Sequence, residues 1–293
     1  MATGIINLKR RIRSVNNTLK TTSAMQLISA VKMRRSVETA FRSRAFVAEA
    51  QAVLGRILAQ GGSHQLLRSR TVKKVLLIAA TADRGLCGSF NSDVVRRTRT
   101  IAAEHRQQGR MVVLITVGRK GAAALRHLDG VELLAAFDHL GDSLPYLQAS
   151  PIGRLVLEEY QSGRVDAVQV IYQHFHSTIN QEVRVAGLIP VVPAEPSDAT
   201  FIAVKPSSGE YYFEPSSEQV LDALLPYLIN MNLYQWLLEA NASEHAARMV
   251  AMKNATDAGG DLVQELTFTA NQVRQARITA EIAEIAAGAA AIG

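Results

Sequence analysis

Residues 83–91 (DRGLCGSFN) carry the side chains best suited to chemistry, because a carboxylate, an arginine, a thiol and two glycines share one short stretch. The stretch directly follows an apolar run of strand length, which is where a phosphate-binding loop lies in a doubly wound fold. It contains neither the G-x-G-x-x-G nor the G-x-x-x-x-G-K-[ST] pattern of nucleotide-binding loops. We therefore interpret it as a structural turn from a strand into a helix, with a nucleotide site as the alternative.

Two histidines and the single cysteine are the other candidates for chemistry. His174 and His176 alternate along a strand, so both can point to one face, but no carboxylate or cysteine lies beside them at metal-ligand spacing. We interpret them as surface or partner-facing residues. Cys87 could act as a nucleophile, although a small buried cysteine is the simpler interpretation. The sequence thus predicts no catalytic, cofactor-binding or metal-ligating residue.

The elements that must position these residues lie in the middle of the chain. Apolar runs predict strands over residues 72–80, 111–117, 131–137, 165–175 and 181–191. Helical patterns occupy residues 91–108, 119–128 and 147–162 between them. This alternation predicts an α/β domain over residues 70–193 with a parallel sheet, and a fifth strand that pairs with the fourth. Residues 194–215, rich in Pro, Ser and Gly, predict a connection to a C-terminal helix.

Both ends of the chain have the pattern of long helices. Apolar or small residues recur at steps of three and four, at Leu8, Ile12, Val15, Leu19, Thr22, Gln26, Ser29, Met33 and Val37 and again at Met249, Met252, Thr256, Gly259, Val263, Leu266, Ala270 and Val273. Such a heptad seam is typical of helices that pair along their length. We predict helices over residues 1–60 and 216–293, with Pro226 as a potential bend, that form an antiparallel coiled coil. Two helices of a compact bundle are the alternative.

Two glycines stand inside the predicted C-terminal helix. Gly259 and Gly260 are adjacent, and each costs roughly 1 kcal/mol relative to alanine in a helix interior. We interpret them as the sign of a close approach by a partner backbone.

The net charge of +6 is unevenly distributed along the chain. Basic residues dominate the N-terminal helix and acidic residues dominate the C-terminal one, which favours their pairing. A basic helix that binds nucleic acid is an alternative. Few aromatic residues interleave with its basic residues, however, and no helix-turn-helix or zinc pattern is present. We predict no nucleic-acid partner.

The composition is that of a globular protein, with 48% hydrophobic and 20% charged residues. No run of about eighteen apolar residues predicts a membrane span. The basic N-terminus lacks the apolar core and cleavage site of a signal peptide. A single cysteine excludes a disulfide scaffold. These features predict a cytosolic chain without a membrane span.

Several motifs make the chain resemble, over essentially its whole length, the gamma subunit of the F-type ATP synthase. The most specific is SEHAARMVAMKNAT at residues 243–256. Others are LKRRI at residues 8–12, AM at 24–25, KMRR at 32–35 and DRGLCG at 83–88, with a shorter match in YYFEP at 211–215. The resemblance implies an α/β fold with long terminal helices: an antiparallel coiled coil with a Rossmann-like domain at its foot.

The resemblance also implies a function. The gamma subunit is the non-catalytic central stalk of an ATP synthase driven by protons or sodium ions. Its coil enters the hexamer of alpha and beta subunits, and its foot rests with the epsilon subunit on the c-ring. Rotation is thereby transmitted between the membrane ring and the catalytic beta subunits. The implied location is the cytoplasmic face of the bacterial inner membrane, as a peripheral protein.

Contact residues follow from the same resemblance, residue by residue. Contacts with the alpha/beta hexamer are implied for Met25, Arg34, Arg35, Arg248, Arg274, Gln275, Thr279 and Ile292. Contacts with the epsilon subunit or the c-ring are implied for Arg84, Tyr211, Tyr212 and Glu214.

The chain departs from the family pattern near Met25. The family has a lysine two residues before this methionine, where this chain has Ser23. The missing cation is expected to weaken one contact with an acidic loop of beta, by about 0.2–1 kcal/mol if the contact is exposed. Cys87 stands alone, without the inserted cysteine pair of the chloroplast form, so a bacterial source is predicted.

Overall fold

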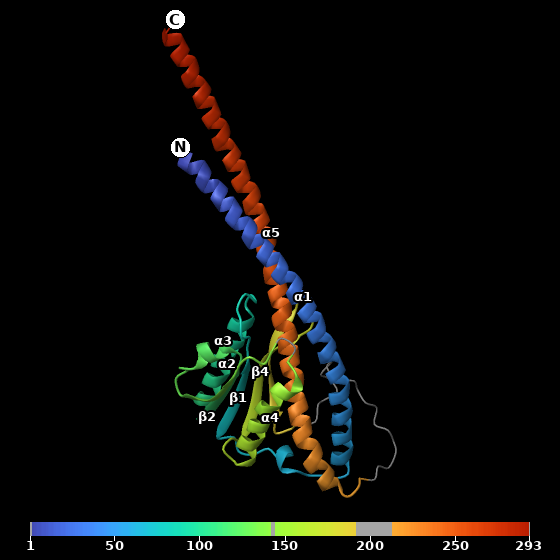
Figure 1. Ribbon diagram of the computed structural model, residues 1–293. Coiled ribbons are helices and arrows are strands. Elements are labelled where there is room, and N and C mark those ends of the chain that lie inside the picture. The colour runs from blue at the N-terminus through green and yellow to red at the C-terminus, as the bar shows by residue number, and fades with distance from the viewer. Residues whose placement is uncertain (1, 142–143, 192–212, 293) are drawn as a thin grey trace. The chain divides into compact units, whose positions relative to one another are not determined.

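The computed structural model describes residues 2–141, 144–191 and 213–292 (Figure 1). In chain order, its elements are α1 (Ala2–Ala59), the short 3-10 helix η1 (Gln65–Leu67), β1 (Lys74–Ala80), α2 (Phe90–Gln107), β2 (Met111–Val117), α3 (Arg119–Leu125), β3 (Val131–Phe137), α4 (Tyr146–Gln161), β4 (Ala167–Phe175), β5 (Gln181–Ile189) and α5 (Ser217–Ile292). Every predicted helix and strand is present, with boundaries that differ by at most three residues. The predicted connection over residues 194–215 lies largely outside the described residues.

The strands form one sheet in the order β3-β2-β1-β4-β5. β1 is parallel to both β2 and β4, and β2 is parallel to β3, whereas β5 is antiparallel to β4. The parallel sheet predicted from the alternation of strands and helices is confirmed for β1 to β4, and β5, for which no direction was predicted, is antiparallel. The predicted pairing of the fifth strand with the fourth is confirmed. A connection of five residues, 176–180, joins this pair and is too short for a parallel crossover.

Helices cover both faces of the sheet. Leu76 and Ile78 of β1 pack into one core cluster with α4 and with parts of α1 and α5, while Val75 and Leu77 pack into another with α2. Because successive strand residues point to opposite faces, a strand buried on both sides must be apolar throughout. This explains the apolar run over residues 75–80 in β1 and the run over residues 111–115 in β2.

Residue contacts divide the chain into two units, which we call the sheet unit (Ala30–Arg248) and the coil unit (Met1–Ser29 with Met249–Gly293). The helices α1 and α5 each contribute to both units. The domain ranges expected from the sequence, 1–60, 70–193, 194–215 and 216–293, stay a prediction.

The coil unit pairs the ends of α1 and α5 along the predicted seam. Thr22 Oγ1 lies 2.7 Å from Thr256 Oγ1, and a Cβ added at Gly259 would lie 2.6 Å from Leu19 Cδ2. A residue later in α1 thus pairs with a residue earlier in α5, so the two helices run antiparallel, as predicted. The close approach expected at both glycines occurs at Gly259 alone, and a leucine side chain makes it, because nothing lies within 4 Å of a Cβ built on Gly260.

Candidate functional site

Asp83 links the turn after β1 by hydrogen bonds to the residues that follow β2 and β3. Its Oδ1 accepts a hydrogen bond from the Arg119 backbone N–H at 3.0 Å, and its Oδ2 accepts one from the His139 backbone N–H at 2.9 Å. These residues follow β1, β2 and β3, whose carboxyl ends meet at one edge of the sheet. The carboxylate therefore has a structural role at the position where a nucleotide enzyme would bind phosphate.

Asn91 closes the same turn from the first turn of α2. Its Oδ1 accepts from the Ala82 N–H at 2.9 Å, and its Nδ2 donates to the Arg84 carbonyl at 3.5 Å and to the Cys87 Sγ at 3.1 Å. Cys87 is buried, as predicted, and burial raises the pKa of its thiol. A buried thiol with a raised pKa is a poor nucleophile, so the structural interpretation of the turn is the one that the geometry supports.

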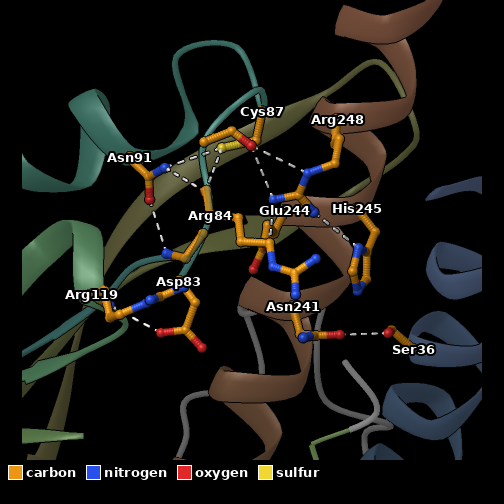
Figure 2. A network of polar contacts seen from close by, with 12 residues as sticks. Ser36, Asp83, Arg84, Cys87, Asn91, Arg119, Asn241, Glu244, His245 and Arg248 are labelled. Atoms are coloured by element: carbon orange, nitrogen blue, oxygen red, sulfur yellow. Dashed lines mark hydrogen bonds and ion pairs between the residues drawn. The ribbon is translucent and has the colours of Figure 1, made fainter. Parts of the chain in front are cut away.

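Arg248 of α5 reaches this turn from the other side (Figure 2). Its Nε and Nη2 donate to the Gly85 carbonyl at 3.4 Å, and its Nη2 also donates to Glu244 Oε1 at 2.6 Å. Nearby, Ser243 Oγ donates to the carbonyl of Gln173 in β4 at 3.1 Å. Helix α5 thus lies across the carboxyl ends of β1 and β4. In doubly wound folds a ligand binds at this point, where the strand order reverses; here α5 occupies it.

The single cysteine gives a test of how Arg248 holds the turn. We expect Arg248→Ala to speed labelling of Cys87 by a thiol reagent about tenfold, because losing hydrogen bonds worth about 1.5 kcal/mol raises the population of the open turn by that factor. The Arg248 cation also lowers the pKa of the buried thiol. Loss of this cation raises the pKa of the thiol, and this change alone slows labelling. Faster labelling of the Arg248→Ala variant therefore reports greater exposure of Cys87.

The matched control is Arg277→Ala. Arg277 forms an exposed pair with Glu281 on the same helix, at 2.7 Å, and lies in the coil unit. We expect Cys87 to be labelled at the same rate in the Arg277→Ala variant as in the unaltered chain. Equal rates in all three proteins would show that Arg248 does not hold the turn closed.

A second polar cluster lies deeper in the sheet unit, and we call Arg44, His174, Gln235 and Glu239 the Glu239 cluster. Glu239 Oε1 accepts from Arg44 Nε at 3.0 Å, from Arg44 Nη2 at 2.8 Å and from Gln235 Nε2 at 2.9 Å. Glu239 Oε2 lies 2.5 Å from His174 Nδ1. No prediction from the sequence included this cluster.

The electrostatics of the Glu239 cluster favour the ionised carboxylate. Burial of Glu239 raises its pKa, but the hydrogen bond and charge of His174, the charge of Arg44 and the hydrogen bond from Gln235 together outweigh burial and lower the pKa below its usual range. Only 2% of the Glu239 side chain is exposed. The cluster is thus an ion pair whose carboxylate is buried and receives several hydrogen bonds, while 25% of the Arg44 side chain is exposed.

The prediction that both histidines face the surface or a partner is wrong for His174, which is buried in this cluster. It holds for His176, whose exposed ring lies 3.3 Å from Glu182 Oε2. The two rings are 4.6 Å apart, so the prediction that they share one face is confirmed. Among the described residues, no group of three or more His, Cys, Asp or Glu side chains could hold a metal ion.

The residues implied as hexamer contacts lie along the two long helices. Arg34 and Arg35 of α1 are exposed, as are Arg274, Gln275 and Thr279 of α5, while Met25 is half-buried. Arg248 differs from them, because only 9% of its side chain is exposed and its guanidinium is bonded within the sheet unit. Ile292 is the last residue of α5, and its side chain is outside the described residues.

The residues implied as epsilon or c-ring contacts do not lie together. Arg84 is exposed in the turn that Arg248 touches, and Glu214 is exposed just before α5 begins at Ser217. From Ser217 to Arg248 a helix rises about 45 Å, so Arg84 and Glu214 lie near opposite ends of the α5 segment in the sheet unit. Tyr211 and Tyr212 lie outside the described residues.

Among the described residues, none on α1 pairs with the part of α5 from Ile278 onward. The register of the coil unit places Ile5 opposite Val273, and every residue from 274 to 287 is exposed. Ile278, Ile282 and Ile285 follow one another at helical spacing there, with 48%, 62% and 72% of their surface exposed. A row of exposed isoleucines on one helix face indicates an interaction surface.

None of the helices in the described ranges is both long and apolar enough to cross a bilayer.

Comparisons with known proteins agree with these observations. A protein-family model described as ATP synthase matches residues 5–292. Among curated relatives, the ATP synthase gamma chain of Pelotomaculum thermopropionicum is 43% identical over 288 residues, which cover 98% of each chain. The ATP synthase gamma chain of Chloroflexus aurantiacus is 40% identical over 291 residues, which cover 97% of each chain.

Two solved structures have the same fold. A chain of the central stalk and c-ring of the Tetrahymena thermophila mitochondrial ATP synthase matches with a TM-score of 0.61 and 25% identity, covering 80% of this chain and 99% of that one. A chain of the Euglena gracilis mitochondrial ATP synthase matches with a TM-score of 0.68 and 17% identity, covering 100% of this chain and 95% of that one. With relatives this similar over nearly the full length of both sequences, the resemblance inferred from the motifs is confirmed, and the chain belongs to the ATP synthase gamma chain family.

Proposed function

We propose that this chain is the central rotor shaft of an F-type ATP synthase driven by protons or sodium ions. It transmits rotation between a membrane c-ring and a catalytic hexamer of alpha and beta subunits, so that ion flow is coupled to ATP synthesis or hydrolysis. The chain itself is non-catalytic, and the catalytic sites belong to the beta subunits. Family membership supports this proposal.

The observation that carries the proposal is the exposed C-terminal end of α5. Its row of Ile278, Ile282 and Ile285 is too apolar to be favourable in water and is not covered by α1. A sleeve of surrounding subunits would bury it. The side chains beyond it, apart from Ile292, are mostly alanine and glycine, which offer no large projections to obstruct rotation within such a sleeve.

The mechanism follows from the two different helices of the shaft. Because α1 and α5 carry different side chains at each level, the beta subunits around the shaft meet different surfaces as it turns. A contact changes a conformational equilibrium only if it stabilises one conformer more than another. Turning the shaft changes which beta subunit receives the stabilising contact, and the nucleotide affinity of each site changes with it.

We assign the contacts as the resemblance implies. Met25, Arg34, Arg35, Arg274, Gln275, Thr279 and Ile292 would face the alpha/beta hexamer, and Arg248 would contact it through the 9% of its side chain that is exposed. Arg84, Tyr211, Tyr212 and Glu214 would face the epsilon subunit or the c-ring; because Arg84 and Glu214 are far apart along α5, they would belong to separate contacts. The chain would be a peripheral protein on the cytoplasmic face of a bacterial inner membrane. Residues 1–60 and 216–293 would form the coiled-coil helices, residues 70–193 the Rossmann-like foot and residues 194–215 its connection.

Co-expression tests the proposal. The tagged chain is produced together with the alpha and beta subunits of its own genome, and the purified material is assayed for subunit composition and ATP hydrolysis. We expect one copy of this chain per alpha/beta hexamer and hydrolysis that depends on its presence. Alpha and beta subunits produced without the chain are the control.

A different outcome of the co-expression would contradict the proposal. A chain that purifies alone in the presence of alpha and beta subunits, and that binds a nucleotide or DNA by itself, would overturn the rotor proposal. It would also reopen the nucleotide and nucleic-acid alternatives raised by the sequence.

A further inference from the structure

The Glu239 cluster joins three elements of the sheet unit at one point. Arg44 belongs to α1, Glu239 to α5 and His174 to β4, and one carboxylate contacts both of the other two side chains. Within the described residues, this is the place where a single buried charge links both long helices to the sheet.

The remaining contacts of α5 with the sheet and with α1 near this point are of two kinds. Trp236 stacks on Tyr172 of β4 with ring centroids 5.8 Å apart and an interplanar angle of 17°. Such apolar contact is non-directional, so it resists separation of the surfaces more than sliding along them. Polar contacts on the same segment of α5 are directional: Ser36 Oγ donates to Asn241 Oδ1 at 2.6 Å, and Ser243 Oγ donates to Gln173 O at 3.1 Å.

The Glu239 cluster resists sliding more strongly than either kind of contact. A shift of α5 along β4 or α1 would part the carboxylate from Arg44 or His174 while it is still buried. An unpaired buried charge is far less stable than a displaced apolar side chain. In some proteins, buried polar or ionic groups fix the register of packed elements.

We propose that Arg44, His174 and Glu239 are positioning residues that lock the sheet to the two long helices, so that rotation of one is transmitted to the other without slip. This inference rests on the proposed function, because slip matters only in a chain that carries torque. It concerns the junction within this chain and involves none of the residues assigned to contacts with other subunits.

The test compares two activities of the complete ATP synthase in membrane vesicles. One is ATP hydrolysis, and the other is ion pumping driven by that hydrolysis, followed with a pH-sensitive dye or by sodium uptake. For Glu239→Gln, which removes the charge and keeps the shape, we expect hydrolysis within about twofold of the unaltered enzyme. We expect the ions pumped per ATP to fall at least threefold, because a slipping junction lets the coil turn without the c-ring.

This ratio separates a positioning role from a merely stabilising one. If Glu239 only stabilises the fold, fewer complexes assemble, both activities fall together and their ratio stays unchanged. An unchanged ratio therefore overturns the inference. The matched control is Glu38→Gln, which removes a carboxylate from an exposed pair with Arg42 on α1, and its ratio is expected to equal that of the unaltered enzyme.

A second variant keeps the test decisive if Glu239→Gln does not assemble. Arg44→Lys retains the positive charge but replaces the two donors that reach Oε1 with a single ammonium group. The same fall in ions pumped per ATP supports the inference, and an unchanged ratio overturns it. An unaltered enzyme that assembles but does not pump would instead refute the rotor proposal, and the inference with it.

Discussion

Replacing Gly118 with alanine is expected to cost about 3 kcal/mol or more of folding free energy. Gly118 has φ of +90°, a backbone conformation that residues with a side chain rarely adopt. A Cβ added there would lie 2.2 Å from the Thr81 carbonyl oxygen and 2.9 Å from the Ala82 carbonyl carbon. Both are backbone atoms at the carboxyl end of β1 and cannot rotate away. Urea unfolding of the isolated chain, followed by circular dichroism, measures the change.

Two other glycines separate the causes of this loss. Gly88 also has positive φ, +57°, but a Cβ there would meet nothing within 4 Å, so Gly88→Ala measures conformational strain alone, about 1 kcal/mol. Gly55 lies inside α1 with open space around it, and Gly55→Ala is expected to stabilise the chain by about 0.5–1 kcal/mol. A cost for Gly118→Ala no larger than that for Gly88→Ala would show that the clash with β1 is relieved by a shift of the backbone.

Most of the fold could be predicted from the sequence, because the burial of strands and helices imposes a recognisable pattern of apolar residues. Strands covered by helices on both faces must be apolar throughout, and this is why β1 and β2 were located within two residues of their ends. Paired helices must keep apolar or small residues at steps of three and four, and positions such as Leu19 and Met252 are less exposed than most of their neighbours. The alternation along β5 does not show its direction, because it is the same whether the neighbouring strand is parallel or antiparallel; only the five residues between β4 and β5 indicate an antiparallel pair.

The Glu239 cluster could not be found in this way. Arg44 and Glu239 are 195 positions apart, and His174 and Glu239 are 65 positions apart. No local pattern states that these side chains meet, since their contact depends on how the sheet packs against the helices. One signal was present: Glu239 directly follows Leu237 and Leu238, which are buried, and a carboxylate in a buried stretch needs a partner. That signal indicates that a cation is nearby without saying which one.

Arg44→Met is expected to destabilise the sheet unit by about 3 kcal/mol at neutral pH. The substitution keeps much of the side-chain volume and removes the cation, which leaves a buried carboxylate with His174 and Gln235 as its remaining partners. Arg42→Met is the matched control on the same helix. The pair of Arg42 with Glu38 is exposed, so its loss is expected to cost about 0.5 kcal/mol or less.

The cost of Arg44→Met should depend on pH in a definite direction. In the unaltered chain, the pKa of Glu239 is lower in the folded than in the unfolded protein. Such a group stabilises the fold above its unfolded pKa, about 4.3 for a glutamate, and this contribution is lost as the pH falls through the folded pKa. Without Arg44 the folded pKa of Glu239 is higher, so the variant has less of this contribution to lose. The difference in unfolding free energy between the two proteins is therefore expected to be largest near pH 7 and to shrink below about pH 4.

This pH dependence identifies what Arg44 contributes. The guanidinium also lies over the Phe41 ring, 5.2 Å from its centroid, and contact with the ring does not depend on the protonation of Glu239. If the cost of Arg44→Met is the same at pH 7 and well below pH 4, Arg44 stabilises the chain by packing on α1, and its bond to Glu239 contributes little. If the cost falls with pH, the ionised carboxylate is the partner that matters, and the charge at the junction of α1, α5 and β4 holds these elements in register.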